Sequence, residues 1–282
     1  MHQHKPLRSA ATLTAMLTAG ALLTACSGTS APAGSESAEG SETVSLAVFN
    51  QYPPAEYVKD GELTGWMIDL LDPISEISGL EFEITQVSNF STIIPGLQSG
   101  RFDVAAANIT VTNERMETLD FVTIATVGTG FATASDDNAT ISEPTDVCGM
   151  TVSALTGSVY EPQMVSINEE CSTEGLEPAT VSLFPDTGAA ILAVQNGRTD
   201  AVIGSYAEIA NAVNESDGLE LQPYQFGQLP EAIGFPKDSP YTQRILDAVN
   251  ELIENGTYAE ILDEYGVPGI AIEKSELNPT VD

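Results

Sequence analysis

The chain has very little histidine and lacks the common nucleotide-binding motifs. Its two histidines, His2 and His4, precede an apolar N-terminal segment. If that segment is removed, no histidine remains for a Ser–His or Cys–His pair, a general base or a metal site. No Walker glycine loop with its lysine occurs, and Gly128-Thr129-Gly130 fails as a dinucleotide motif because Thr133 replaces the third glycine. We therefore expect no catalytic residue, metal site or cofactor of these kinds.

Basic residues are also scarce. The 282 residues include 41 Asp and Glu but only nine Lys and Arg. Without Lys5 and Arg8 of the N-terminal segment, 9 − 2 = 7 bases remain and the net charge is −34. Such a surface repels nucleic acid and anionic lipid. We interpret it as a surface that favours solubility rather than as evidence for a cationic substrate, which stays the alternative.

The N-terminus is predicted to direct export. Lys5 and Arg8 precede an apolar run over 10–23 that is too short to span a bilayer. The end of this segment, Leu23-Thr24-Ala25-Cys26, resembles a bacterial lipobox. This predicts a signal peptide over 1–25, a lipidated Cys26 and a disordered tether over 26–43, with the protein anchored to the outer face of the cell membrane. An ordinary signal cleaved after Ala25 is the alternative.

Only two cysteines follow Cys26. Outside the cytoplasm, Cys148 and Cys171 are expected to form a disulfide. Closing that loop would contribute ~3 kcal/mol in the chain-entropy model. The alternative is a reactive thiol, for which the chain offers no histidine as a helper base.

One segment of the sequence occurs twice. Residues 97–104 (LQSGRFDV) and 194–201 (VQNGRTDA) lie 97 positions apart, and each is typical of a helix end, a glycine stop and a buried strand. Two such units predict two lobes of the same α/β build, with a ligand at the strand ends. In this register Asn108 corresponds to Ser205, and both are expected just past a strand.

Alternating strands and helices predict an α/β protein in which each lobe has a mainly parallel sheet flanked by helices. Two chain crossings between the lobes, near 128–132 and 228–233, would form a two-segment hinge. The predicted boundaries are 44–130 plus 231–272 for lobe 1, 131–230 for lobe 2, and 273–282 for a C-terminal tail.

Several short motifs then resemble a known family. They are Tyr52-Pro53-Pro54, Gly65-Trp66-Met67-Ile68-Asp69-Leu70, Ile94-Pro95-Gly96-Leu97, Thr110-Val111-Thr112-Asn113-Glu114-Arg115, Gly157-Ser158 and Gly256-Thr257-Tyr258. Together they resemble the polar amino-acid solute-binding proteins (family 3) of bacterial ABC importers. The paired cysteines and the C-terminal segment are similar to an actinobacterial branch of it. The resemblance implies a two-lobe periplasmic-binding-protein type II fold that closes over a ligand.

Arg115 is the strongest candidate for ligand binding. It is one of four arginines after the signal; Arg101 and Arg198 belong to the repeated corners, and Arg244 lies near the C-terminus. A guanidinium at a strand end can hold a carboxylate by two parallel hydrogen bonds. The resemblance implies that Arg115 does so for the ligand's α-carboxylate. The alternative is a structural salt bridge with Asp120 or Glu117.

The remaining site residues surround the same cleft. The free amides of Gly157-Ser158-Val159, at a predicted helix start, favour an anion. Tyr52 and Phe90 match family positions that form walls around the ligand side chain, or else they belong to the core. The full predicted set is Tyr52, Phe90, Asn108, Ile109, Thr110, Arg115, Gly157, Ser158, Val159 and Ser205.

One position departs from the family pattern. Ser205 stands where the family commonly has an aspartate that pairs with the ligand's α-ammonium. A neutral serine cannot make that charge-assisted bond. The amine is therefore bound by backbone carbonyls, by another acid such as Asp186, or is missing from the ligand, so the sequence leaves the ligand's identity open.

The resulting prediction is a monomeric binding protein, not an enzyme. It captures a small carboxylate-bearing ligand, an amino acid or derivative, and delivers it to an ABC permease and its ATPase. The resemblance also leaves two alternatives: a dehydratase on the same fold, with Glu161 or Asp186 as the general acid, or a sensor that signals to a separate receptor.

Overall fold

The computed structural model describes residues 42–136 and 139–281. The predicted signal peptide, the lipidated Cys26 and nearly all of the tether lie outside the described residues. Strands alternate with helices along most of the described chain, which confirms the α/β class.

An eight-stranded sheet forms the centre of the fold, in the order β5-β1-β6-β11-β7-β10-β8-β9. The strands are β1 (Glu42–Phe49), β5 (Leu80–Val87), β6 (Val104–Thr110), β7 (Leu119–Ala134), β8 (Thr151–Leu155), β9 (Thr180–Phe184), β10 (Ala201–Ser205) and β11 (Leu219–Pro236). A small antiparallel sheet contains β2 (Gln51–Tyr52), β3 (Glu56–Lys59) and β4 (Glu62–Thr64).

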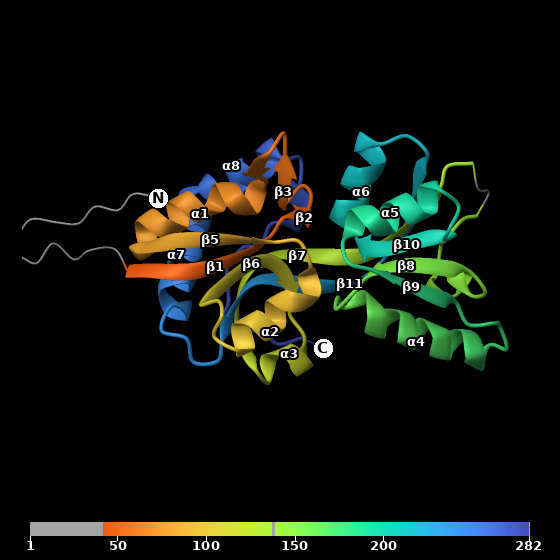
Figure 1. The fold of residues 1–282 in the computed structure, drawn as a ribbon, viewed down its shortest axis with the longest axis horizontal. Helices are drawn as coiled ribbons and strands as arrows, with labels where there is room; N and C mark the ends of the chain where they lie inside the picture. Colours follow the sequence, from red (N-terminus) through yellow and green to blue (C-terminus); the bar gives the residue numbers. More distant parts are fainter. Residues whose placement is uncertain (1–41, 137–138, 282) are drawn as a thin grey trace, which may run out of the picture. The chain divides into compact units, whose positions relative to one another are not determined.

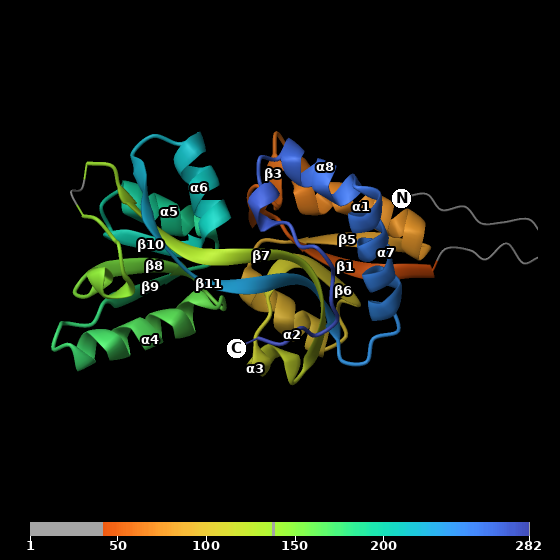
Figure 2. The same ribbon diagram turned by 180° about the vertical axis from the view of Figure 1, so that it is seen from behind.

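Two long strands pass between the two halves of the sheet (Figures 1 and 2). β7 and β11 pair antiparallel with each other, and they contain the two predicted crossings near 128–132 and 228–233. The strands outside them pair in parallel: β1 with β5 and β6, and β8 with β9 and β10. The expected parallel sheets thus form the two flanks, and the antiparallel pair connects them. The lobe boundaries stay a prediction.

Helices cover both faces of each half (Figure 1). They are α1 (Trp66–Ser78), α2 (Ile93–Gln98), α3 (Asn113–Met116), α4 (Tyr160–Thr173), α5 (Thr187–Gln195), α6 (Tyr206–Glu215), α7 (Thr242–Asn255) and α8 (Thr257–Glu264). Three short 3₁₀ helices are η1 (Phe90–Thr92), η2 (Pro144–Val147) and η3 (Pro268–Ile270). The apolar stripe of α1 faces the core as its spacing predicts, with Met67, Leu70 and Ile74 almost fully buried. Among the described residues, no helix has the length and apolar character needed to cross a membrane.

The two repeated corners have the same structure. Gly100 and Gly197 both adopt left-handed backbone conformations, with φ of 71° and 63°. Asp103 accepts a hydrogen bond from the Ser45 amide at 2.8 Å, and Asp200 accepts one from the Thr151 amide at 2.7 Å. Each aspartate thereby joins its strand to the neighbouring parallel strand. The repeated segment therefore has a structural role in each half of the sheet.

Several predicted element boundaries were wrong. Asn108 is within β6, which continues to Thr110, instead of just past the strand. The helix expected from Ser158 begins at Tyr160, after an N-cap at Val159. The 3₁₀ turn before α2 is capped by Asn89, whose side chain accepts the Ser91 amide. Pairing with β11 extends β6 past Asn108 to Thr110.

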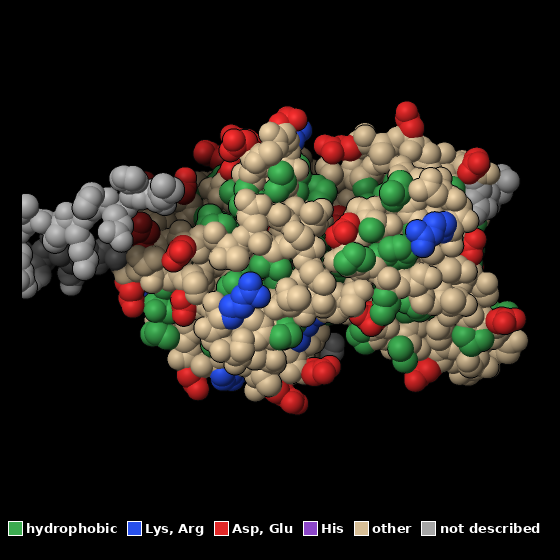
Figure 3. Space-filling model, viewed as in Figure 1, with side chains coloured by type: hydrophobic (Ala, Val, Ile, Leu, Met, Phe, Trp, Pro, Cys, Tyr) green, Lys and Arg blue, Asp and Glu red, His purple; other side chains and the backbone are tan. Residues whose placement is uncertain are grey.

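The disulfide and the acidic surface agree with the sequence. Cys148 and Cys171 are joined, with their Cα atoms 5.8 Å apart. Acidic side chains are scattered over the face shown in Figure 3, where basic side chains are few. Two ion pairs occur among the described residues, Lys237–Asp120 and Arg244–Glu42.

Candidate functional site

The Arg115 side chain reaches from α3 to the loop before α4. Its Nη1 donates to the Thr110 carbonyl at 2.7 Å, and its Nη2 donates to the Gly157 carbonyl at 3.0 Å. The backbone is set by Thr112, whose hydroxyl caps α3 by accepting the Arg115 amide at 3.2 Å. These contacts connect the end of β6 to the loop before α4.

Arg115 has no carboxylate partner among the described residues. The predicted alternative, a salt bridge to Asp120, does not form, because Asp120 is bonded to Lys237 at 2.9 Å. Burial lowers the pKa of the Arg115 guanidinium to about 10, opposed by Tyr160 and Glu114. The group stays cationic at neutral pH, and its direct hydrogen-bond partners among the described residues are two backbone carbonyls. Thr110, Arg115 and Gly157 are called the arginine end of the site below.

The loop before α4 already holds an anion of the protein itself. The Gly157 amide donates to the carboxylate of Glu161. The Ser158 hydroxyl donates to the Leu155 carbonyl at 2.7 Å and accepts the Tyr160 amide at 3.2 Å. The start of α4 therefore attracts a negative group, as backbone amides at a helix start do. A ligand carboxylate would have to replace Glu161 to use the Gly157 amide.

The structure adds three carboxyl groups that the sequence analysis did not select. Glu56 is fully buried, and Glu208 and Glu231 are each 2% exposed. Glu56 begins β3, Glu208 is in the first turn of α6, and Glu231 is in β11. Glu231 raises the pKa of Glu56 and of Glu208 by electrostatic repulsion, and Glu208 raises the pKa of Glu56, so the three carboxyls lie in one region. We call these three residues the acidic end of the site.

Predicted residues hold part of this acidic end. The Tyr52 hydroxyl donates to Glu231 Oε1 at 3.0 Å, and Asn108 Nδ2 donates to Glu56 Oε2 at 3.0 Å. Asn108 has a positive φ of 40°, which turns it toward Glu56 from inside β6. Ser205 is 2% exposed and lies close enough to Tyr52 to lower the pKa of that hydroxyl. The predicted polar residues and the three glutamates thus form one buried group.

Several oxygen atoms in this group lack a partner. Among the described residues, Glu56 Oε1, both carboxyl oxygens of Glu208 and the Asn108 side-chain oxygen are buried and accept no hydrogen bond. A buried acceptor left without a donor costs roughly 1–3 kcal/mol, and more if it is charged. The arrangement therefore favours a donor or cation that can approach all of them.

The pKa values show the same need for a positive partner. Burial raises the pKa of Glu231 to about 8, although the Tyr52 hydrogen bond works against this. Burial and repulsion from Glu231 also raise the pKa of Glu56 and of Glu208 well above the usual range. These carboxyls must either hold protons or be neutralised by a cation. No cluster in residues 42–136 or 139–281 is arranged to hold a metal ion.

Three predicted residues contribute apolar surface. Phe90 packs edge-to-face on Phe49 with ring centroids 5.5 Å apart and is 6% exposed. Ile109 is fully buried, and its side chain lies on the side of β6 that faces Gly234. Val159 is 6% exposed. Of the two acids considered as general acids or amine partners, Asp186 caps α5 by accepting the Ala189 amide at 2.7 Å, and Glu161 binds Gly157.

A family comparison agrees with this architecture. Residues 44–268 match the model of the bacterial extracellular solute-binding proteins, family 3. The chain belongs to this family. The match spans both halves of the sheet and both ends of the site, and it places the protein outside the cytoplasm.

Individual family members are similar over most of their length. The arginine-binding protein ArgT of Corynebacterium glutamicum is 30% identical over 230 residues, which cover 80% of this chain and 75% of that protein. A probable histidine-binding protein of Campylobacter jejuni is 26% identical, covering 79% of this chain and 84% of that protein. The structure of an ancestral arginine-binding protein bound to arginine has a TM-score of 0.72 at 26% identity, covering 79% of this chain and 97% of that one. These relatives are binding proteins, and this family member is likewise a binding protein and not an enzyme.

Proposed function

We propose that this family member is a lipid-anchored receptor of an ABC importer that captures a basic amino acid with a cationic side chain, of the arginine or lysine type. The observation that carries the proposal is the presence of two ends of opposite charge that both interact electrostatically with Tyr160. Arg115 is cationic and lacks a carboxylate partner, whereas the three buried glutamates include acceptors without donors. A basic amino acid has one carboxylate for the first end and two cations for the second.

The acidic end also accounts for the missing aspartate. Glu208 is three residues beyond Ser205, in the helix that follows β10, and both of its carboxyl oxygens are free of hydrogen bonds among the described residues. In this proposal Glu208 binds the α-ammonium, and Glu56 and Glu231 receive the side-chain cation. The names of the arginine-binding relatives support this ligand class. In this proposal the three buried acids take part in binding and are distinct from the acidic surface, which was interpreted as favouring solubility.

Closure would follow from the ligand's contacts with both parts of the site. Arg115 is joined to β6, and Glu208 lies on α6 beyond β10, so a ligand bound to both stabilises the form in which they are close. Tyr52 and Tyr160, both at most 8% exposed, supply aromatic surface beside the ligand side chain.

A panel of four ligands tests both ends separately. Calorimetric titration with arginine should give 1:1 binding. Citrulline has the shape of arginine without its side-chain charge, and agmatine lacks the carboxylate; each should bind about thirtyfold or more weakly, since a hydrogen bond to a charged group contributes ~2 kcal/mol. Lysine tests whether any side-chain cation suffices. Equal affinity for arginine and citrulline would contradict the assignment of the acidic end, and absence of binding by all four would overturn the proposed ligand class.

The membrane anchor rests on the sequence Leu23-Thr24-Ala25-Cys26 and on the family's location. In cells, the Cys26→Ala variant should move from the membrane fraction to the soluble extracytoplasmic fraction. A variant that stays on the membrane without Cys26 would contradict the lipid anchor, whereas ligand binding by the purified protein should not change.

A further inference from the structure

A cavity that is separate from the proposed amino-acid site lies beside the middle of the two long strands, β7 and β11. It has a volume of about 430 Å³, within the range of roughly 300–1,000 Å³ that is usual for small-molecule sites. It is lined by β7, β11, α6, Pro54 and the segment 265–270. None of its lining residues belongs to the acidic end or to the predicted ligand-binding set, so it is a separate feature.

The Gly128-Thr129-Gly130 segment, which is not a dinucleotide-binding motif, shapes this cavity. A Cβ atom at Gly128 would lie 2.4 Å from Nε2 of Gln225, and one at Gly130 would lie 2.6 Å from the ring of Tyr206. Neither glycine has a positive φ, so backbone conformation does not require them. The two glycines instead leave room for the side chains of Gln225 and Tyr206, which line the cavity.

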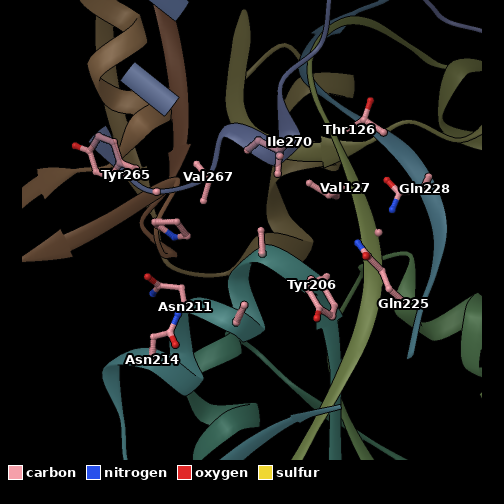
Figure 4. A pocket seen from close by; sticks show the side chains of 16 residues that line it. Thr126, Val127, Tyr206, Asn211, Asn214, Gln225, Gln228, Tyr265, Val267 and Ile270 are labelled. Atoms are coloured by element: carbon pink, nitrogen blue, oxygen red, sulfur yellow. The ribbon is translucent and has the colours of Figure 1, made fainter. Parts of the chain in front are cut away.

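The lining combines polar groups with apolar surface and carries no charge. Figure 4 shows Tyr206, Gln225 and Gln228 on one side of the cavity and Asn211 and Asn214 on another. Apolar surface comes from Val127, Val267 and Ile270 among others. In a chain with 41 acidic residues, a cavity with no acidic or basic lining residue favours a neutral ligand.

The polar side chains are available for a ligand. Among the interactions of the described residues, none pairs the side-chain amides of Asn211, Asn214, Gln225 or Gln228 with a protein group, and the Tyr206 hydroxyl has no such partner either. Each amide offers two N–H donors and a carbonyl acceptor. Neighbouring hydroxyl groups on a ring both donate and accept, so they match several amides at once, and the apolar ring face matches the apolar lining.

From this geometry we infer that the cavity binds a small neutral polyhydroxylated ring, of the sugar or cyclitol type. Gln225 and Tyr206, for which the two glycines leave room, line one side of the cavity, and Asn211 and Asn214, further along α6, line another. The site is separate from the proposed amino-acid site and does not depend on that function.

The test uses glucose and myo-inositol as probes on the purified protein without added amino acid. Calorimetry and NMR titration should show 1:1 binding of at least one probe. Gln225→Ala should weaken it about tenfold, the loss expected for one hydrogen-bonding side chain. Gly128→Ala should weaken binding similarly, because the added methyl group displaces Gln225. The control Gln243→Ala changes an exposed glutamine on α7 that is bonded to Asp247, and it should bind like the parent protein.

The double variant Gly128→Ala/Gln225→Ala separates displacement from general damage. If Gly128 acts only by seating Gln225, the double variant should bind no more weakly than Gln225→Ala alone. Failure of both probes to bind, or equal binding by Gln225→Ala and the parent, overturns the inference. Because arginine is absent from these titrations, a negative result leaves the proposed amino-acid site untouched, and failure of that site leaves this test intact.

Discussion

The arginine end and the acidic end of the site differ in how their charges are neutralised. At the arginine end, the guanidinium donates to two backbone carbonyls and the Gly157 amide donates to Glu161. At the acidic end, three carboxyls are almost fully buried and four side-chain oxygens of Glu56, Glu208 and Asn108 accept nothing from the described residues. One end is thus satisfied by the protein itself, whereas the other requires protons or a cation. The unsatisfied end is therefore the better guide to ligand chemistry.

The largest effect is expected at the arginine end. Arg115→Ala should weaken arginine binding by ~3 kcal/mol, because it leaves the ligand carboxylate without its charged partner. Calorimetric titration measures the loss. Arg198→Ala is the matched control: this arginine lies on an exposed repeated corner, 5.7 Å from the Phe184 ring centroid, and its removal should leave affinity unchanged. Unchanged affinity in Arg115→Ala would remove Arg115 from the site.

A substitution at the acidic end should lower the affinity for arginine and raise the stability of the ligand-free protein. Glu208→Gln should weaken arginine binding by ~2 kcal/mol, because a neutral amide replaces a charged acceptor. The same change should raise the thermal stability of the ligand-free protein at neutral pH, because a buried carboxyl without a hydrogen-bond partner is removed. Glu215→Gln, an exposed position on the same helix, should do neither. A Glu208→Gln protein with parental affinity and lower stability would show a purely structural role.

The acidic end should also make the stability of the protein depend on pH. The pKa of Glu231 rises from its ordinary value of 4.5 to about 8 in the folded protein. Between pH 4.5 and about 8, Glu231 keeps a proton in the folded state that it has released in the unfolded state. The contribution of this proton to the free energy of unfolding is therefore complete below pH 4.5 and is lost as the pH rises toward about 8. The expected slope is about 1.4 kcal/mol per pH unit for one proton.

Thermal unfolding over that range measures the slope. Glu231→Gln should reduce the slope by the share of one proton, and saturating arginine should flatten it, because a cationic ligand takes the place of the protons. Glu220→Gln, an exposed position on the same strand, should keep the parental slope. A stability that increases with pH through this range would show that the acidic end is ionised and paired without ligand.

Much of the scaffold was predictable because local rules act on it directly. The repeated glycine corners, the apolar stripe of α1, the Asp186 cap and the break at Gly256 all follow from backbone and capping preferences, and the structure contains each of them. Arg115 was found because arginine is rare in this chain. The strand ends were harder, because pairing with the neighbouring long strand extends β6 through Asn108 and makes one strand of 219–236.

The acidic end could not be selected from the sequence in the same way. Glu56, Glu208 and Glu231 are three of 41 acidic residues, and no spacing distinguishes them from solvated ones. The same applies to Gly128 and Gly130, whose purpose depends on Gln225 and Tyr206 across the sheet and on α6. The amino-acid order alone was sufficient for the fold class, the family and the disulfide, and it made Arg115 the candidate for carboxylate binding, because these depend on composition and local pattern. Only the tertiary structure decided which acids are buried, because burial is set by the packing of β3, β11 and α6. A buried glutamate, unlike an exposed one, must hold a proton or be neutralised by a cation.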